Sequence, residues 1–299
     1  MPIFETASSW PRQATDLPTV AQPQHVLMAE PAAFCVEEVH NDFMSDANGQ
    51  PLRVDSATAY TQWQQLLRAF EQHAGLKCIA LPAVGGLADL CFTANPSLAL
   101  PQPDGSTDIW LGRMVHCSRK DETNQHEAYF KQLGIMPKQM PAAVPHFEGH
   151  GDGILHPRRY LLHVGVGPRS CRAAWEVLAA TYPQMDLLLY ELQDPRFYHL
   201  DTALAALNER TALFVPQAFS TAGLELLHAA FPDAIALTET EALNFAGNAF
   251  CPDQKHVFLQ AGCAALEEKL RAHHFIPVPV DTSEFMKSGG SVFCLKMAY

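Results

Sequence analysis

The segment EGHGDGILHPRRYLLHVGVGPRSCRAAWEVLAATYPQMDLLLY, residues 148–190, predicts how this chain folds. It opens with a short strand that carries polar residues at 148–155, and after a turn it continues with an apolar strand at 160–164. The apolar residues then take the spacing of an amphipathic helix near 170–180, and a third apolar strand follows at 187–190. The segment therefore predicts one strand–strand–helix–strand unit.

The same order of elements recurs along the chain at intervals of roughly fifty residues. Three further units are expected. The first has its elements at 89–92, 108–111 and 124–132, and the second at 199–205, 212–215, 221–230 and 234–237. The third has its elements at 243–250, 256–259, 264–273 and 275–278. Most of another unit lies at 24–28, 57–73 and 78–81, with its missing strand supplied by 292–297. Five units closed in this way predict an α/β ring, with the first strands around the axis and the helices outside. The alternative is an ordinary open α/β sheet.

Length and composition predict one catalytic domain with a short extension. The 299 residues are 48% hydrophobic, enough to bury a core in one large domain or two small ones. Pro11, Pro18 and Pro23, together with little periodicity, predict a loosely ordered arm over residues 1–23. The repeat then predicts a single domain over residues 24–299.

Charge and cysteine content limit the classes of partner. The net charge of -12 argues against nucleic acid and anionic membranes and is compatible with a small cationic substrate. We find no apolar run long enough to span a membrane and no signal peptide, which predicts a cytoplasmic protein. The eight cysteines have neither metal-site nor disulfide spacing, so most are expected to be reduced and to fill the core. The oligomeric state stays open.

The repeat brings chemistry-bearing residues to equivalent places. Asn95, Asp152, Asp201, Asn248 and Cys294 fall on the expected inner strands of the five units. Side chains at equivalent positions in a ring converge at one end of its axis, which is what an active site needs.

Four motifs carry a resemblance to a known family. These are FTANP at 92–96, EGHGD at 148–152, HLD at 199–201 and GGSVFC at 289–294. Together they resemble the guanidino-group-modifying superfamily of arginine deiminases, dimethylarginine hydrolases, amidinotransferases and arginine dihydrolases. The resemblance covers residues 25–295 and implies the pentein fold, a five-bladed α/β propeller.

The resemblance implies three catalytic roles. Cys294 matches the family's nucleophile, whose thiolate attacks the guanidinium carbon. His199 matches the general acid and base that protonates the departing ammonia and then deprotonates the hydrolytic water. Glu148 matches the acid that binds the guanidinium. Asp201, two residues beyond His199, is expected on the same face of the strand, where it holds the imidazole or the substrate.

The resemblance also implies a set of substrate-binding residues. Asp152 matches a binding acid, although arginine deiminases place it one residue closer to the glutamate. Arg119 matches the arginine that binds the substrate carboxylate, with Arg113 as the competing candidate. Asn41 matches a loop residue that contacts substrate. Asp201 and Asn95 complete the set of five, and Asn248 is expected either to line the pocket or to hold a turn. His146, His150 and His156 have no metal-site spacing, so neither a metal nor a cofactor is expected.

Asn95 favours one activity within the family. Arginine deiminases have an aspartate at this place, whereas arginine dihydrolases have an asparagine and hydrolyse the ureido product a second time, giving ornithine, carbon dioxide and two ammonia. A neutral amide suits a neutral ureido group better than a carboxylate does. We therefore expect an arginine dihydrolase. The alternatives are a dimethylarginine dimethylaminohydrolase, an arginine deiminase, an amidinotransferase and a non-catalytic ribosome-binding protein of the same fold.

Overall fold

The computed structural model describes residues 2–299 and has α/β architecture. Its strands form five separate sheets. In sheet order they are β15 (Met297–Ala298), β2 (His25–Ala29) and β3 (Lys77–Leu81); β4 (Ser97–Pro101), β5 (Thr107–Leu111) and β6 (Lys138–Gln139); β7 (Gly153–Leu155), β8 (Leu161–Val166), β9 (Asp186–Glu191) and β1 (Ile3–Phe4); β10 (Leu204–Ala206), β11 (Ala212–Phe214) and β12 (Ile235–Ala236); and β13 (His256–Gln260) with β14 (Ile276–Val280).

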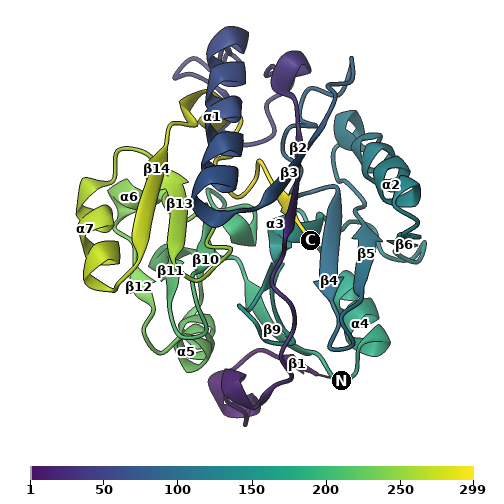
Figure 1. Ribbon diagram of the computed structural model, residues 1–299, viewed down its shortest axis with the longest axis vertical. Coiled ribbons are helices and arrows are strands. Elements are labelled where there is room, and N and C mark those ends of the chain that lie inside the picture. Colours follow the sequence, from purple (N-terminus) through teal and green to yellow (C-terminus); the bar gives the residue numbers. More distant parts are fainter. Residues whose placement is uncertain (1) are drawn as a thin grey trace.

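The five long helices lie around the periphery of the molecule, and the C-terminus lies near its centre (Figure 1). They are α1 (Ser56–Ala74), α2 (Glu122–Gln132), α4 (Arg172–Thr181), α5 (Thr221–Ala230) and α7 (Ala264–Ala272). The expected helices at 57–73, 124–132, 170–180, 221–230 and 264–273 are confirmed to within two residues at each end. Short helices α3 (Gly149–Asp152), α6 (Glu239–Leu243) and α8 (Ser283–Met286) lie between strands.

Four of the five sheets share one pairing pattern. The inner strand pairs antiparallel with the middle strand, which pairs parallel with the strand after the helix. In the fifth sheet the inner strand is reduced to a single antiparallel bridge between Phe250 and Phe258. The inner strand of the first sheet is β15, which pairs Met297 with Leu27, so the C-terminal end of the chain completes this sheet as the sequence predicted. The strand expected at 292–297 is wrong in its bounds, because residues 292–295 form a turn and the strand begins at Met297.

The predicted inner strands are wrong in one respect, because their polar residues lie in turns. Residues 89–92 form turns ahead of β4, Gly149–Asp152 forms one helical turn ahead of β7, and Leu200–Thr202 forms a 3-10 turn ahead of β10. Residues 244–249 likewise form turns. A strand would have pointed alternate side chains away from the centre, whereas these turns let consecutive polar residues contact neighbouring segments.

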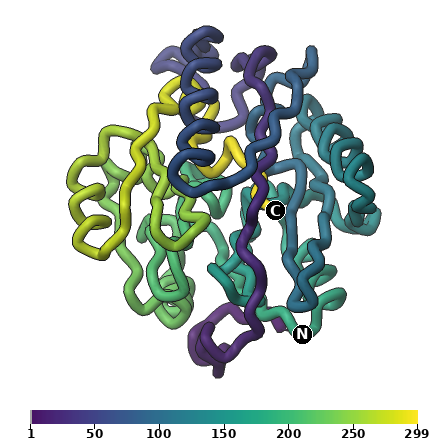
Figure 2. The backbone as a smooth tube through the Cα atoms, in the orientation of Figure 1, coloured from purple at the N-terminus to yellow at the C-terminus, as the bar shows by residue number. Residues whose placement is uncertain are grey.

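The N-terminal segment is packed and does not form the loosely ordered arm that was predicted. Ile3 and Phe4 pair parallel with β9, and Trp10 is buried with its indole Nε1 donating to Asp186 Oδ2 at 2.9 Å. Figure 2 shows this purple segment coiled at one end of the molecule before it runs along the structure toward β2. Met1, also part of the predicted arm, lies outside the described residues.

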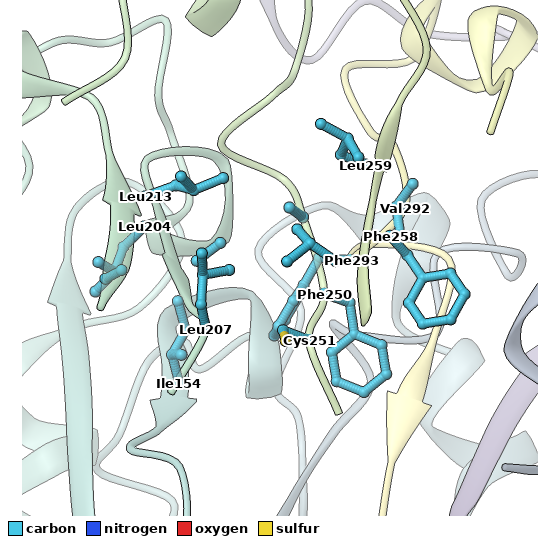
Figure 3. Close-up of a cluster of buried hydrophobic side chains, with 14 of the residues drawn as sticks. Ile154, Leu204, Leu207, Leu213, Phe250, Cys251, Phe258, Leu259, Val292 and Phe293 are labelled. Atoms are coloured by element: carbon cyan, nitrogen blue, oxygen red, sulfur yellow. The ribbon is translucent and has the colours of Figure 1, made fainter. Parts of the chain in front are cut away.

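Apolar side chains from several sheets meet in one core. Figure 3 shows part of this cluster, with Ile154, Leu204 and Leu213 on one side of the view and Phe250 and Phe258 on the other. All five are less than 10% exposed. Burial of one such side chain contributes about 1.5–3 kcal/mol to the free energy of unfolding. The core therefore fixes the strands, and with them the turns that precede the inner strands. In the described part of the chain, no helix is long and apolar enough to cross a membrane.

Candidate active site

Cys294 lies in a tight turn between α8 and β15, and two glycines make this turn possible. Gly289 has a φ of +81°, which L side chains rarely adopt. A Cβ on Gly290 would lie 2.5 Å from a ring carbon of Phe92 and 3.1 Å from the Cβ of Cys294. The Gly-Gly pair ahead of the cysteine is therefore a steric requirement of its position.

Asn248 holds the cysteine turn from the opposite side. Its Oδ1 accepts the backbone N–H groups of Ser291 and Cys294, both at 3.1 Å. Its Nδ2 lies 2.9 Å from the carbonyl oxygen of Asp201 and 3.2 Å from the thiol Sγ. Of the two roles left open by the sequence, these contacts favour the one in which Asn248 holds a turn.

Cys294 and Asp201 form a buried pair. The thiol Sγ donates to Asp201 Oδ2 at 3.2 Å, and the thiol is 3% exposed. Burial raises the pKa of Asp201 to about 7, an effect that its hydrogen bond with Cys294 offsets only in part. Burial and the nearby carboxyl raise the pKa of Cys294 well above its usual value. The expectation that Asp201 lies beside His199 on one strand face is thus corrected, because its side chain contacts the thiol.

His199 and Glu148 form a second buried pair. His199 Nε2 lies 2.8 Å from Glu148 Oε2, and the same oxygen accepts from Arg169 Nη1 at 3.2 Å. The backbone N–H of Val115 donates to the other carboxylate oxygen at 3.0 Å. Burial alone would raise the pKa of Glu148, but the bond to His199 and the charge of Arg169 outweigh it and hold the pKa far below its usual value. Glu148 is therefore a fixed negative charge beside the imidazole.

Asp152 contacts the backbone next to His199. Its Oδ1 accepts the backbone N–H of Leu200 at 3.0 Å, and the residue is 1% exposed. Burial raises the pKa of Asp152 to about 6. Its carboxyl thus contacts the backbone that carries His199, while its Oδ2 has no hydrogen-bond partner within residues 2–299, and substrate binding by Asp152 stays a prediction.

Asn95 and Arg119 meet at the wall of the cavity. Arg119 Nη1 donates to Asn95 Oδ1 at 3.1 Å, while its Nε and Nη2 donate to the Glu122 carboxylate at 2.9 and 2.8 Å. Because a guanidinium can only donate, this contact fixes which end of the amide is oxygen. The amide Nδ2 is buried and has no hydrogen-bond partner within residues 2–299.

Arg169 is a cavity residue that the sequence reasoning missed. It is 5% exposed, and its guanidinium carbon lies 4.8 Å from the centre of the Tyr198 ring. The available signal was an arginine in the turn between the buried strand β8 and helix α4. Arg113, the alternative to Arg119, instead donates to four backbone carbonyls of the 140–144 segment, which gives it a structural role.

A cavity opens between these groups. Asn41 stands at its rim, with Nδ2 donating to the Ser288 carbonyl at 3.2 Å, and the His40 ring stacks on His116 with centroids 3.8 Å apart. The cavity is lined by His40, Asn41, Met44, Asp89, Phe92, Asn95, Arg119, Arg169, Tyr198, His199, Ser288, Gly290 and Cys294. Across residues 2–299 no group of three His, Cys, Asp or Glu side chains could hold a metal ion.

Comparison with known proteins assigns the family. No protein-family model matches the chain. The dimethylarginine dimethylaminohydrolase of Mycobacterium tuberculosis is 35% identical over 269 residues, which cover 89% of this chain and 83% of that protein. The bifunctional arginine dihydrolase/ornithine cyclodeaminase AgrE of a Nostoc species is 30% identical over 91% of this chain. The match spans only 37% of AgrE.

Solved structures agree with this assignment. The N-terminal domain of the cyanobacterial arginine dihydrolase ArgZ, bound to substrate, superposes with a TM-score of 0.84. It is 27% identical, and the match covers 92% of this chain and 97% of that domain. A dimethylarginine dimethylaminohydrolase adduct with S-methyl-L-thiocitrulline has a TM-score of 0.77 at 22% identity, which shows the shared fold. This chain therefore belongs to the pentein-fold family of guanidino-modifying enzymes that includes dimethylarginine dimethylaminohydrolases and arginine dihydrolases.

Proposed function

We propose that this protein hydrolyses the guanidino group of arginine through a covalent intermediate on Cys294, and that it acts as an arginine dihydrolase. The observation that carries the general reaction is the pairing of Cys294 with Asp201 opposite the pairing of His199 with Glu148. One pair supplies the nucleophile and a proton acceptor, and the other supplies an acid and base held by a fixed charge. The likeness to ArgZ and AgrE supports the narrower activity.

The first step is attack by sulfur on the guanidino carbon. The thiol proton passes to Asp201 Oδ2, which lies 3.2 Å away, as the carbon–sulfur bond forms. Because burial raises the pKa of both groups, the empty site holds a thiol. The cationic substrate supplies the positive charge that favours the thiolate. The nucleophile is thus activated mainly when substrate is present.

His199 acts in both half-reactions. It gives a proton to the departing nitrogen, which leaves as ammonia with the electrons of the broken carbon–nitrogen bond. It then takes a proton from the water that attacks the amidino carbon. The carbon–sulfur bond breaks, and the released thiolate takes its proton back from Asp201. Glu148 Oε2, which lies 2.8 Å from His199 Nε2, orients the imidazole. Asp152 acts as a positioning residue for the His199 turn.

Asn95 favours a second round of hydrolysis. Its oxygen is occupied by Arg119, so the group left for a ligand is the Nδ2 donor, which lacks a partner in the described chain. A donor pairs with the oxygen of a ureido group, whereas a guanidinium presents only donors. The ureido product is thereby retained, and a second attack by Cys294 gives ornithine, carbon dioxide and a second ammonia.

Two arginines provide the positive wall for the substrate carboxylate. Arg119, predicted for this role, uses donors on all three of its nitrogens for Glu122 and Asn95. Arg169 makes one hydrogen bond to the described residues, with Glu148, and keeps its other donors. We therefore assign the main carboxylate contact to Arg169, with Arg119 positioning Asn95. Asn41 at the rim contacts the amino-acid end of the substrate.

The fold is proposed to be a five-bladed α/β propeller, with each of the five sheets as one blade and residues 24–299 as a single catalytic domain. The shared pairing pattern and the closure by β15 support this arrangement. One end of the axis then carries the turns of the active site.

One experiment separates the members of the family. Purified protein is incubated with arginine, asymmetric dimethylarginine, agmatine and citrulline, and ammonia is counted per substrate consumed. The proposal expects two ammonia per arginine, with ornithine as the product. The similarity to the mycobacterial enzyme makes dimethylarginine the second candidate substrate. Release of dimethylamine from it, without two ammonia from arginine, would replace the dihydrolase assignment with that activity.

A further inference from the structure

A second cavity lies near the inner strands of the sheets, beyond the turns that form the Cys294 cavity. Four inner strands contribute Pro101, Ile154, Ala206 and Ala298, and the fifth sheet contributes Phe250. Asn95, Asp152, Asp201, Asn248 and Cys294, which line the Cys294 cavity or contact the groups that do, each lie six residues or fewer ahead of one of these positions. The two cavities share no lining residue among residues 2–299.

The side chain of Lys296 is buried against this second cavity. Lys296 is 1% exposed and contributes to the cavity lining. Its Nζ lies 3.1 Å from the centre of the Phe293 ring and 4.5 Å from that of Phe250, and makes no hydrogen bond or ion pair with any described residue. An ammonium removed from water without a hydrogen-bond partner is unfavourable, and burial lowers the pKa of Lys296 to about 7, an effect that the negative charges of Asp201 and Cys294 offset only in part.

The lining of the cavity suits an anion. It includes two basic side chains, Lys296 and the exposed Arg158, and no Asp or Glu among residues 2–299. His150 and His156 also line it, but both ring nitrogens of each are engaged and burial lowers each pKa to about 3, so both rings are neutral.

The remaining lining is mainly hydrocarbon. Ile154, Phe250, Cys251 and Phe293 lie near one another in Figure 3, and Ala206 and several prolines complete the wall. We propose that this cavity binds a small aliphatic carboxylate, whose carboxylate group pairs with Lys296 Nζ and whose chain lies against these apolar side chains. The carboxylate supplies the partner that Lys296 lacks, and the apolar walls remove the chain from water.

Hexanoate is the probe for this proposal. Its affinity for the whole chain is measured by isothermal titration calorimetry. We expect one saturable site, and at least about tenfold weaker binding of hexanol, which has the same chain without the charge. Lys296→Met keeps the length and apolar stem of the side chain and should weaken hexanoate binding at least about tenfold. Circular dichroism and thermal unfolding verify that the variant is folded.

Two matched variants locate the bound probe. Ala206→Trp fills the second cavity while leaving Lys296 in place, and it should abolish hexanoate binding; this variant decides the matter if Lys296→Met does not fold. His199→Ala alters the Cys294 cavity and should leave hexanoate affinity unchanged. The proposal is overturned by absence of saturable binding, by equal affinity for hexanol or in folded Lys296→Met, by full binding to Ala206→Trp, or by loss of binding in His199→Ala.

Discussion

At the scale of single residues, the chemistry rests on which groups are paired. Cys294 is paired with Asp201 and His199 with Glu148, and every one of these side chains is buried. Asn248 contacts the cysteine turn and the backbone of Asp201, so it links the nucleophile to the neighbouring segment. Loss of any of these contacts should therefore affect activity.

Cys294→Ala tests the nucleophile. We expect turnover to fall by at least about a thousandfold, because removal of a covalent nucleophile typically costs several orders of magnitude. Cys117→Ala, which changes an exposed cysteine, is the matched control and should keep its activity. Acid-quenched wild type should show an amidino adduct on the peptide that contains Cys294 by mass spectrometry. Retention of a tenth of the wild-type rate would exclude this role.

The pH dependence of kcat/KM tests the role of Asp201. A carboxyl with a pKa raised to about 7 is protonated at lower pH and cannot accept the thiol proton. The rate should therefore fall as the pH drops below about 7. Asp201→Asn should lower the rate and remove this acidic limb from the profile. An unchanged limb in that variant would assign the titration to another group.

Asn95→Asp tests how far the reaction proceeds. A carboxylate favours a guanidinium over a neutral ureido group, so the variant should release citrulline and yield about one ammonia per arginine instead of two. Products are identified by chromatography. Asn124→Asp makes the same change on an exposed position of α2 and should leave the ratio at two. A wild type that makes only citrulline contradicts the dihydrolase assignment.

At the scale of elements, each outer helix is defined locally and then fixed by packing. Helix α5 begins after Ser220, whose Oγ accepts the backbone N–H of Gly223 at 3.1 Å, and it buries Leu226 and Leu227. Helix α1 ends at Gly75, which adopts the left-handed conformation with a φ of +65°. The sequence therefore marks the start of α5 and the end of α1 with residues suited to those caps.

Ser220→Ala tests the cap of α5. Removal of the side-chain acceptor leaves a helical N–H without its partner and should lower the free energy of unfolding by about 1 kcal/mol. Ser220→Asp retains an acceptor and should stay close to wild type. Urea unfolding followed by circular dichroism measures both. Equal stability of the alanine variant and the wild type would show that the cap contributes nothing.

At the scale of the whole molecule, the last strand connects distant parts of the chain. Met297 in β15 follows the cysteine turn by a few residues. It is fully buried and pairs with Leu27 in β2. The N-terminal segment adds β1 to the sheet of β9. Both ends are thus part of the packed structure, and a change in either should be felt by the entire domain.

Met297→Ala tests this closure. Loss of a fully buried methionine side chain should lower the free energy of unfolding by about 2–5 kcal/mol. Met136→Ala is the control, because Met136 is 71% exposed and should matter little. If the five sheets form one cooperative unit, fluorescence, circular dichroism and activity should be lost together in one urea transition. Separate transitions would contradict a single domain.

The sequence by itself determined the repeat, the helices and the residues available for chemistry. Apolar periodicity is local, so α5 and α7 could be located from the chain alone. The Gly-Gly pair before Cys294 and the acid–histidine motifs indicated the family because their spacing is fixed within short segments. Of the five residues at equivalent places in the repeat, Asn95 and Cys294 line one cavity. Asp201 and Asn248 contact Cys294, and Asp152 contacts the backbone of Leu200.

Only the tertiary structure decided how those residues pair. Asp201 contacts Cys294 across 93 positions of sequence, and Asp152 contacts the Leu200 backbone across 48. Neither contact could be read from spacing, because the polar residues lie in turns whose shape depends on partners in other sheets. The same holds for Arg169, whose guanidinium contacts Glu148 in the wall of the cavity. It also holds for Lys296, whose Nζ lies near the rings of Phe293 and Phe250 only in the folded chain. Side-chain pairing depends on long-range packing, and the local pattern of a chain does not contain it.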